Sequence, residues 1–420
     1  MSEFSYINGV LFAEKVSIQK IAKDVGTPFY CYSRNAILKN FINFKKVFKA
    51  RSTMICFAVK ANSNLSILKI LSKLGAGADV VSMGELIRAL SAGIDPKKIV
   101  FSGVGKSREE ISKGLRSGIR QFNVESESEF IEIANIARKM HCIASVALRI
   151  NPNIRAETHK KITTGGYDNK FGITCDQAIR LFKMSSKIQE INITGLAIHI
   201  GSQITQTTPF VKSFSVITKL MNNLKRMGFS IKSMDVGGGL GVQYNNEKTI
   251  SLKKYGSIVS SLVSKFGCEL ILEPGRFIVA DAGILVTKVL RTKSNQHKRF
   301  IIVDAAMNDF MRPAIYDAYH KIIPLKKSKP SRTKKMKKWD VVGPICESSD
   351  TFGVNRPFDP KEDDILIICS VGAYGFAMSS NYNSRGHIPE ILVSSNKYSV
   401  VRKRQKLDNL IKTDITPRWL

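Results

Sequence analysis

The feature that most limits the fold of this chain is a regular alternation of strand-like and helix-like segments from about Thr53 to Pro274. The strand candidates are short, apolar and mostly rich in β-branched residues, and amphipathic stretches separate them. Such alternation predicts parallel strands covered by helices. The strand candidates are Thr53–Val59, Ala78–Ser82, Lys98–Ser102, Gln121–Val124, Ala144–Ile150, Gly195–Ile200, Ser233–Val236 and Glu269–Glu273.

About eight βα repeats in roughly 250 residues fit the size of a closed (β/α)8 barrel. The structural alternative, a doubly wound open sheet, usually has fewer strands. We therefore expect an α/β protein whose residues 28–280 form a (β/α)8 barrel.

The pattern changes after about Ala280, where strand-like segments follow one another without regular helices between them. This change predicts a second, mostly antiparallel β domain over residues 281–420. Residues 1–27 contain one short strand candidate, Val10–Ala13, and we assign them to the same domain. The later strand candidates are Gly283–Thr292, Arg299–Asp304, Trp339–Val342 and Asp364–Ser370.

The formal net charge of +31 raises the possibility of nucleic-acid or anionic-membrane binding. Lysine and arginine are spread along the chain, and the densest basic cluster, residues 326–338, has no interleaved aromatics for base stacking. We interpret that cluster as a solvated loop and expect no specific nucleic-acid partner. A nucleic-acid-binding module is the rival hypothesis, and it leaves the strand-end residues described below unexplained.

The seven cysteines are scattered, odd in number and without a CxxC pair. A disulfide framework or a structural zinc site is therefore not expected, and a reducing, cytoplasmic environment fits best. The N-terminus does not resemble a signal peptide, and no apolar run is long enough to span a bilayer, so we expect no membrane association.

Polar residues recur where the predicted barrel strands end, and reactive groups of such barrels cluster at that end. Lys60 ends the first strand, and desolvation there would make its amine a better nucleophile toward carbonyls. The alternative is a lysine that reaches the surface from a strand end. The other strand-end residues are Asp79, Ser82, His199, Gly237–Gly239 and Glu273–Arg276.

The triple glycine Gly237–Gly239 lets backbone N–H groups approach an anion closely, and Arg276 follows the last strand. Together they favour a phosphate site over a simple tight turn. Glu273 is a candidate partner for a pyridine nitrogen, or else a salt-bridge partner of Arg276. His199 could lie beside an aromatic cofactor or be an ordinary core residue, and no metal is expected because no partner lies at ligand spacing. A lysine, a phosphate site and a carboxylate are the parts that pyridoxal 5'-phosphate requires.

These motifs resemble those of the diaminopimelate decarboxylases, a family in the alanine-racemase-like class of pyridoxal-phosphate enzymes. The resemblance runs over nearly the whole chain, from Thr27–Tyr30 to Asn381–Arg385. Ser349 departs from the family's usual glycine, and we expect it to tighten a turn without affecting the side chains that act. Gly386 and His387 also depart, standing where the family usually has an Arg/Pro-rich pair. The matching segments are Phe57–Asn62, Gly77–Ser82, His199–Gln203, Gly237–Gly239, Glu273–Arg276, Met307–Pro313, Tyr316, Cys346–Ser348 and Gly372–Tyr374.

The resemblance implies that Lys60 holds the cofactor covalently, that His199 stacks on its ring and that Glu273 faces its pyridine nitrogen. It also implies that the phosphate lies against Gly239 and the backbone of Gly275 and Arg276. The implied cofactor-binding residues are Lys60, Asp79, His199, Ser202, Gly239, Glu273, Gly275, Arg276 and Tyr374.

The resemblance further implies a homodimer with shared active sites, in which Cys346 and Glu347 act in the partner subunit's site. Cys346 would be the general acid, because a thiol can donate a proton near neutral pH. Its alternative is the usual fate of a free cysteine, a small buried apolar side chain. The implied substrate-binding residues are Arg276, Arg312, Tyr316, Glu347 and Tyr374.

The implied reaction is decarboxylation of meso-2,6-diaminopimelate to L-lysine and carbon dioxide, the last step of lysine biosynthesis. Another basic amino acid, namely ornithine, arginine or carboxynorspermidine, is the alternative substrate. Cys346–Ser348 favours diaminopimelate, because a second amino-acid end needs a carboxylate clamp, Arg312, and an ammonium acceptor, Glu347. A noncatalytic cofactor-binding protein is a further alternative, but such proteins usually lack the β domain.

Overall fold

A computed structural model describes residues 3–48, 52–154, 169–264, 266–327, 336–358 and 361–420. The chain divides into two compact units, each described by itself below. The barrel unit comprises Asn40–Gln243 and Glu247–Phe277, and the β unit comprises Met1–Lys39, Tyr244–Asn246 and Ile278–Leu420. Positions 328–335 of the predicted basic loop lie outside the described residues.

Eight parallel strands form the barrel. Each strand pairs with the next one along the chain, and the pairing of β12 with β5 closes the barrel. The closed sheet confirms the (β/α)8 prediction and rules out the open sheet. All eight predicted strands are present, although β10 begins at Ile191 instead of Gly195. The strands are β5 Thr53–Ala58, β6 Gly77–Val80, β7 Ile99–Phe101, β8 Gln121–Val124, β9 Ala144–Arg149, β10 Ile191–Ala197, β11 Ser233–Asp235 and β12 Glu269–Leu272.

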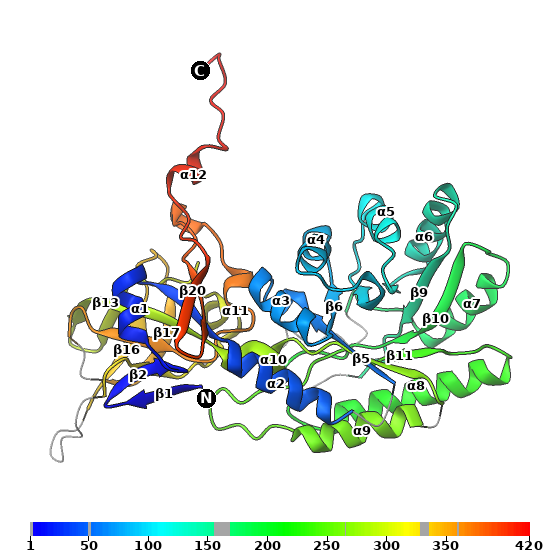
Figure 1. Ribbon diagram of the computed structural model, residues 1–420, viewed down its shortest axis with the longest axis horizontal. Coiled ribbons are helices and arrows are strands. Elements are labelled where there is room, and N and C mark those ends of the chain that lie inside the picture. Colours follow the sequence, from blue (N-terminus) through cyan, green and yellow to red (C-terminus); the bar gives the residue numbers. More distant parts are fainter. Residues whose placement is uncertain (1–2, 49–51, 155–168, 265, 328–335, 359–360) are drawn as a thin grey trace. The chain divides into compact units, whose positions relative to one another are not determined.

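Helices alternate with these strands along the barrel unit and cover them from outside (Figure 1). Local sequence defines their ends: Ser107 and Glu110 form a reciprocal capping box at the start of α5, and Gly118 ends it in the left-handed conformation. The helices are α3 Leu65–Lys73, α4 Met83–Ser91, α5 Arg108–Ser117, α6 Glu127–Lys139, α7 Cys175–Ser185, α8 Thr208–Arg226 and α9 Leu252–Ser264.

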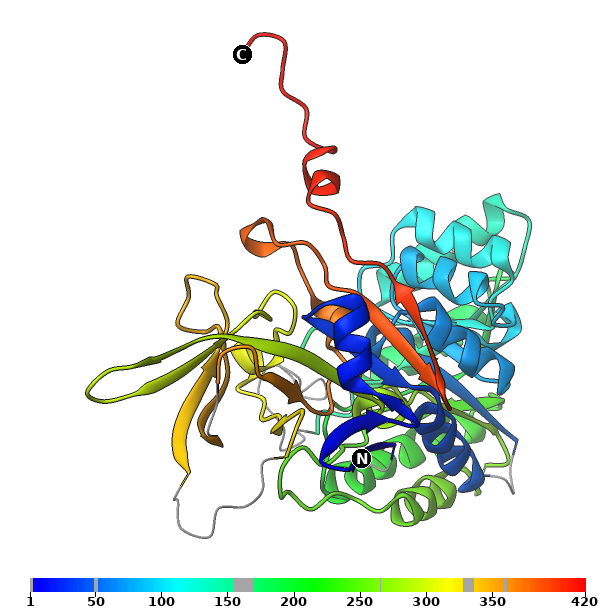
Figure 2. The ribbon, with the colours of Figure 1, turned by 60° about the vertical axis from the view of Figure 1, so that its left-hand side comes forward.

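The β unit is mostly antiparallel, as predicted. Its three-stranded sheet contains β1 Phe4–Ile7, β2 Val10–Ala13 and β3 Val16–Ser17. Its larger, nine-stranded sheet includes a long hairpin, visible in Figure 2, that pairs β13 with β14. The strands of the larger sheet are β4 Phe29–Ser33, β13 Gly283–Ser294, β14 Arg299–Val303, β15 Ile322–Pro324, β16 Lys337–Val342, β17 Thr351–Phe358, β18 Ile365–Ile368, β19 Glu390–Ser394 and β20 Lys397–Arg402.

Five further α-helices are described. Of these, α2 and α10 each contain residues of both units. The helices are α1 Ile18–Val25, α2 Arg34–Lys46, α10 Arg276–Val279, α11 Arg312–Tyr316 and α12 Asp408–Ile411.

Strand β4 shows where the structure differs from the proposed domain boundary at residue 28. All five of its residues are buried, and it pairs with β13 on one side and β19 on the other. An apolar strand between two neighbours belongs to the centre of a sheet. Residues 29–39 consequently lie in the β unit, and the barrel unit begins at Asn40.

Replacing Gly77 by alanine should destabilise the barrel. A Cβ there would meet the backbone oxygen of Lys98 at less than contact distance and lie 2.9 Å from the Cys56 sulfur. Overpacking of this kind costs about 1–3 kcal/mol. Gly84→Ala is the control, because its Cβ would have nothing nearer than 3.8 Å and alanine favours a helix. Urea unfolding of both variants checks this, and equal stability would contradict it.

Candidate active site

Lys60 lies just beyond the carboxyl end of β5, in the short 3-10 turn Val59–Ala61. Its ammonium forms an ion pair with the Asp79 carboxylate on the neighbouring strand β6. The Asp79 side chain has no exposed surface, whereas that of Lys60 is 34% exposed. The second Asp79 oxygen, Oδ1, is buried and has no hydrogen-bond partner within the described residues. The ion pair holds the lysine at the barrel end, where sequence analysis placed it.

Two further buried carboxyl groups, Asp235 at the end of β11 and Glu273 just after β12, share one amide. Asn123 Nδ2 lies 3.2 Å from Asp235 Oδ2 and 3.3 Å from Glu273 Oε1. Burial raises the pKa of both carboxyl groups, and the charges of Asp235 and Asp79 raise the pKa of Glu273 further, well above its ordinary value. The positive charge of Lys60 opposes this rise, because it lowers the pKa of Glu273.

His199 follows β10 and is neutral. Burial lowers its pKa well below the usual value, and the positive charges of Arg149 and Lys60 act in the same direction. The backbone N–H of Gly238 donates to His199 Nδ1 at 3.2 Å. Because Nδ1 accepts this bond, the ring proton lies on Nε2.

The glycine loop Gly237–Gly239 depends on the absence of side chains. Gly237 and Gly239 have φ values of +65° and +95°, which favour glycine. A Cβ at Gly237 would lie 2.5 Å from the Ile198 oxygen, and one at Gly238 or Gly239 would overlap a backbone oxygen, that of Glu273 or Gly201 respectively. The loop backbone is thus packed directly against the segments that follow β10 and β12.

Three other predicted residues accompany this loop in the barrel unit. Ser202 is partly buried, and the nearby backbone bond from Ile204 N–H to the Gly239 oxygen, 2.9 Å long, fixes its segment against the loop. Gly275 packs against the lysine segment, because a Cβ there would lie 2.9 Å from Ala61 Cβ. Arg276 is buried at the start of α10.

The remaining predicted residues belong to the β unit. Arg312 is buried at the first position of α11, and Tyr316 ends that helix. Tyr374 is partly buried and has a positive φ of 56°. Cys346 and Glu347 are exposed in the turn between β16 and β17.

This turn corrects one expectation about Ser349, which was predicted to leave the acting side chains unaffected. The Ser349 hydroxyl donates to Glu347 Oε2 at 2.9 Å, and the Tyr382 hydroxyl donates to Glu347 Oε1. These two bonds, that of Tyr382 being the stronger influence, lower the pKa of Glu347. The serine therefore contacts a predicted substrate-binding residue, because its side chain turns back toward the residue two positions earlier.

Sequence analysis missed three polar residues of the barrel interior: Asn123, Asp235 and Arg149. Arg149 is buried and its Nη1 lies 2.6 Å from Glu125 Oε1. Each residue lies on or at the end of a strand that was correctly predicted. The available signal was a single polar residue in an apolar strand. Asp235 was the easiest of the three to predict, because it comes shortly before the glycine loop.

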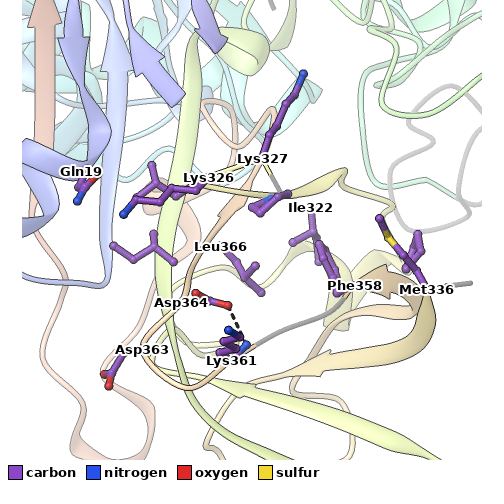
Figure 3. A pocket seen from close by; sticks show the side chains of 14 residues that line it. Gln19, Ile322, Lys326, Lys327, Met336, Phe358, Lys361, Asp363, Asp364 and Leu366 are labelled. Carbon is purple, nitrogen blue, oxygen red and sulfur yellow. Dashed lines mark hydrogen bonds between the residues drawn. The ribbon is translucent and has the colours of Figure 1, made fainter. Parts of the chain in front are cut away.

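A cavity of about 650 Å³ lies elsewhere in the β unit. Figure 3 shows lysines such as Lys326 and Lys361 around an apolar interior that includes Leu366. None of the predicted site residues lines it. Within the described residues, no cluster of histidine, cysteine, aspartate and glutamate could hold a metal, and no helix is long and apolar enough to cross a membrane.

Comparison with known proteins identifies the class. The family of pyridoxal-dependent decarboxylases, through the model of its pyridoxal binding domain, matches residues 34–280. Diaminopimelate decarboxylases from Vibrio cholerae and Haemophilus influenzae are 44% and 45% identical to this chain, and each alignment covers 98% of both proteins. The chain therefore belongs to the diaminopimelate decarboxylase family of pyridoxal-dependent enzymes.

Solved structures agree with this assignment. The Helicobacter pylori diaminopimelate decarboxylase complexed with L-lysine has a TM-score of 0.90 and 43% identity, covering 94% of this chain and 98% of that one. The M. jannaschii enzyme in complex with L-lysine has a TM-score of 0.93 and 38% identity, covering 99% and 98%. The whole chain, including the β unit, thus has the fold of these decarboxylases.

The barrel unit fits the family's cofactor, pyridoxal 5'-phosphate. The glycine loop carries no side chains and Gly239 is only partly buried, so its backbone N–H can approach an anion closely. Lys60 supplies an amine, and the unpartnered Asp79 oxygen leaves a buried polar atom beside it. Glu273 supplies a buried carboxyl group with a raised pKa, of the kind that can hydrogen-bond a ring nitrogen.

Asp235→Asn should make the stability of the cofactor-free protein less dependent on pH. A buried carboxyl group with a raised pKa binds its proton more tightly in the folded state, so its contribution to the free energy of unfolding falls as pH rises above about 4. Asparagine cannot ionise, although it can still accept the Gly237 N–H bond, which is 2.9 Å long in the wild type.

Urea unfolding at about pH 5 and about pH 8 measures this dependence. The exposed Asp176→Asn is the control and should follow the wild type. An Asp235→Asn protein that loses as much stability as the wild type between these pH values would contradict the assignment.

Proposed function

We propose that this chain decarboxylates meso-2,6-diaminopimelate at its D-configured centre and releases L-lysine and carbon dioxide. The observation that carries the proposal is the grouping of Lys60, Asp79, His199 and Glu273 with the glycine loop at the carboxyl ends of the barrel strands. Family membership gives the substrate, because the relatives at 44% and 45% identity are diaminopimelate decarboxylases.

When bound, pyridoxal phosphate supplies an electron-poor ring that accepts the electron pair left by the departing carboxylate. Lys60 Nζ would anchor the cofactor, and Asp79 holds that amine in place through the ion pair. Glu273 would hydrogen-bond the ring nitrogen through its buried carboxyl group, whose pKa is raised. His199 would lie against the ring, and its neutral imidazole would add no competing charge.

The phosphate is proposed to bind to the backbone N–H groups of Gly239, Gly275 and Arg276, with Ser202 near the same loop. Glycine at positions 239 and 275 lets the backbone approach the anion. The Arg276 guanidinium adds positive charge for the phosphate or for a substrate carboxylate.

The β unit is proposed to supply the groups that select the substrate. Arg312 binds the carboxylate at the substrate's L-configured end, and Glu347 accepts the ammonium of that end. The lowered pKa of Glu347 supports this role, because the group is ionised wherever an ammonium ion could meet it. Tyr316 and Tyr374 complete the substrate contacts, and Tyr374 also contacts the cofactor.

Cys346 is proposed to donate a proton from Sγ to the substrate Cα after carbon dioxide leaves. Its exposure, together with that of Glu347, supports a homodimer in which each subunit contributes these two residues to the partner's site. We place the enzyme in the cytoplasm, because all seven cysteines are free thiols and a reducing compartment preserves them.

Lys60→Ala should abolish the covalent attachment of the cofactor and lower carbon dioxide release from diaminopimelate by at least about 10³-fold. Lys73→Ala, at the end of α3, should retain full activity and the yellow colour of the bound cofactor. Turnover and visible absorbance are measured together. Ornithine, arginine and carboxynorspermidine serve as rival substrates, and faster turnover of any of them by the wild type would overturn the substrate assignment.

Mixing two inactive variants tests the shared site. Cys346→Ala should reduce turnover by about 10²-fold, because it removes a general acid. When Cys346→Ala and Lys60→Ala subunits are mixed and reassociated at random, half of the dimers contain one intact site, so activity should rise to about a quarter of the wild-type value. Mixtures that stay as inactive as their components would show that each chain supplies its own Lys60 and Cys346.

A further inference from the structure

Arg312 is held by a fully buried histidine that the proposed reaction does not yet use. Its Nη1 lies 2.7 Å from His320 Nε2, and His320 Nδ1 lies 2.8 Å from the backbone oxygen of Cys369. His320 has no exposed surface, and the whole Arg312 residue is only 6% exposed. The three groups form one continuous chain inside the β unit.

The two ends of this chain fix the protonation of the imidazole. A carbonyl oxygen only accepts hydrogen bonds, so His320 Nδ1 carries the proton and donates it to Cys369. A guanidinium only donates, so Nε2 carries the lone pair that receives Arg312. A second proton on Nε2 would remove this acceptor and place two cations in contact, so His320 is a neutral acceptor in this arrangement.

Two aromatic rings hold the same pair from other sides. The guanidinium carbon of Arg312 lies 4.6 Å from the centre of the Tyr244 ring, a cation–π distance. Tyr244 and Phe310 each meet the His320 ring edge to face, with ring centres 4.9 Å and 4.7 Å away. The packing of Tyr244 and the charge-assisted hydrogen bond to His320 thus both orient the guanidinium plane.

We propose that His320 is a positioning residue that, together with Tyr244, presents Arg312 to the carboxylate at the L-configured end of the substrate. The proposal rests on the proposed function of Arg312 and deepens it. Arginine recognises a carboxylate through parallel hydrogen bonds, and a guanidinium oriented before binding loses less side-chain freedom on binding. His320 therefore contributes to selection of ligands that carry this carboxylate.

L-lysine and cadaverine are the matched probes, because they differ by that carboxylate alone. Two variants distinguish the role of His320 Nδ1 from that of Nε2. His320→Asn retains a donor where Nδ1 meets Cys369 and loses the acceptor for Arg312, whereas His320→Gln can keep an acceptor near the position of Nε2. Calorimetric titration of the pyridoxal-loaded enzyme should show L-lysine binding about tenfold more weakly to His320→Asn. Its affinity for cadaverine should stay within about twofold of the wild type, and His320→Gln should retain most of its affinity for L-lysine.

A general structural role gives a different pattern. The positioning role is overturned if His320→Asn and His320→Gln weaken the binding of L-lysine equally, or if the binding of cadaverine weakens to the same extent. A double-mutant cycle of His320→Asn with Arg312→Lys adds a second criterion, because residues that act through one another give non-additive losses. The proposed reaction fails separately if the wild-type enzyme releases no carbon dioxide from diaminopimelate. If the variants still differ in L-lysine affinity as expected, the positioning role of His320 stands even then.

Discussion

The ion pair between Lys60 and Asp79 is the interaction on which the rest of the barrel site depends. A carboxylate without exposed surface is costly unless a cation compensates it, and Lys60 is the cation that the structure places there. The negative charge of Asp79 acts in turn on the carboxyl groups of Asp235 and Glu273. Burial raises the pKa of Glu273, and the charges of Asp235 and Asp79 raise it further. Lys60 thus compensates the buried charge of Asp79, and its own positive charge lowers the pKa of Glu273, the group proposed to meet the ring nitrogen.

The glycine loop links the remaining groups of the site to one another. The N–H of Gly238 fixes the tautomer of His199, and its α-carbon lies against the backbone oxygen of Glu273. The Asp235 carboxylate accepts the N–H of Gly237 while its other oxygen faces Asn123. Since one short backbone segment contacts all of these groups, a shift of the loop would move the imidazole and disturb the carboxyl pair together. Close backbone packing, which only glycine permits, gives the site its fixed geometry.

The sequence was sufficient to predict the barrel because buried parallel strands are continuous apolar runs, and each of the eight could be recognised separately. Lys60, Glu273 and Gly237–Gly239 could be predicted because they interrupt such runs at their ends. Strand β4 was assigned to the wrong side of the domain boundary, because its apolar residues do not indicate which sheet they join. The contact between Arg312 and His320 was not predicted either, since it depends on how α11 and the loop after it fold back onto β18.

The turn that carries Glu347 shows why a substitution beside a functional residue cannot be judged from sequence spacing alone. Met307 and Ile345 each donate a backbone N–H to Asp350 at 2.7 Å, which holds the base of the turn. On that fixed base the Ser349 hydroxyl reaches Glu347, a bond that glycine at the same position could not make. The serine engages one Glu347 oxygen and the Tyr382 hydroxyl engages the other, so both favour the ionised form. An ammonium group arriving from a substrate would meet a carboxylate that is already charged and oriented, and the departure from the family's usual glycine is consistent with the proposed selection of diaminopimelate.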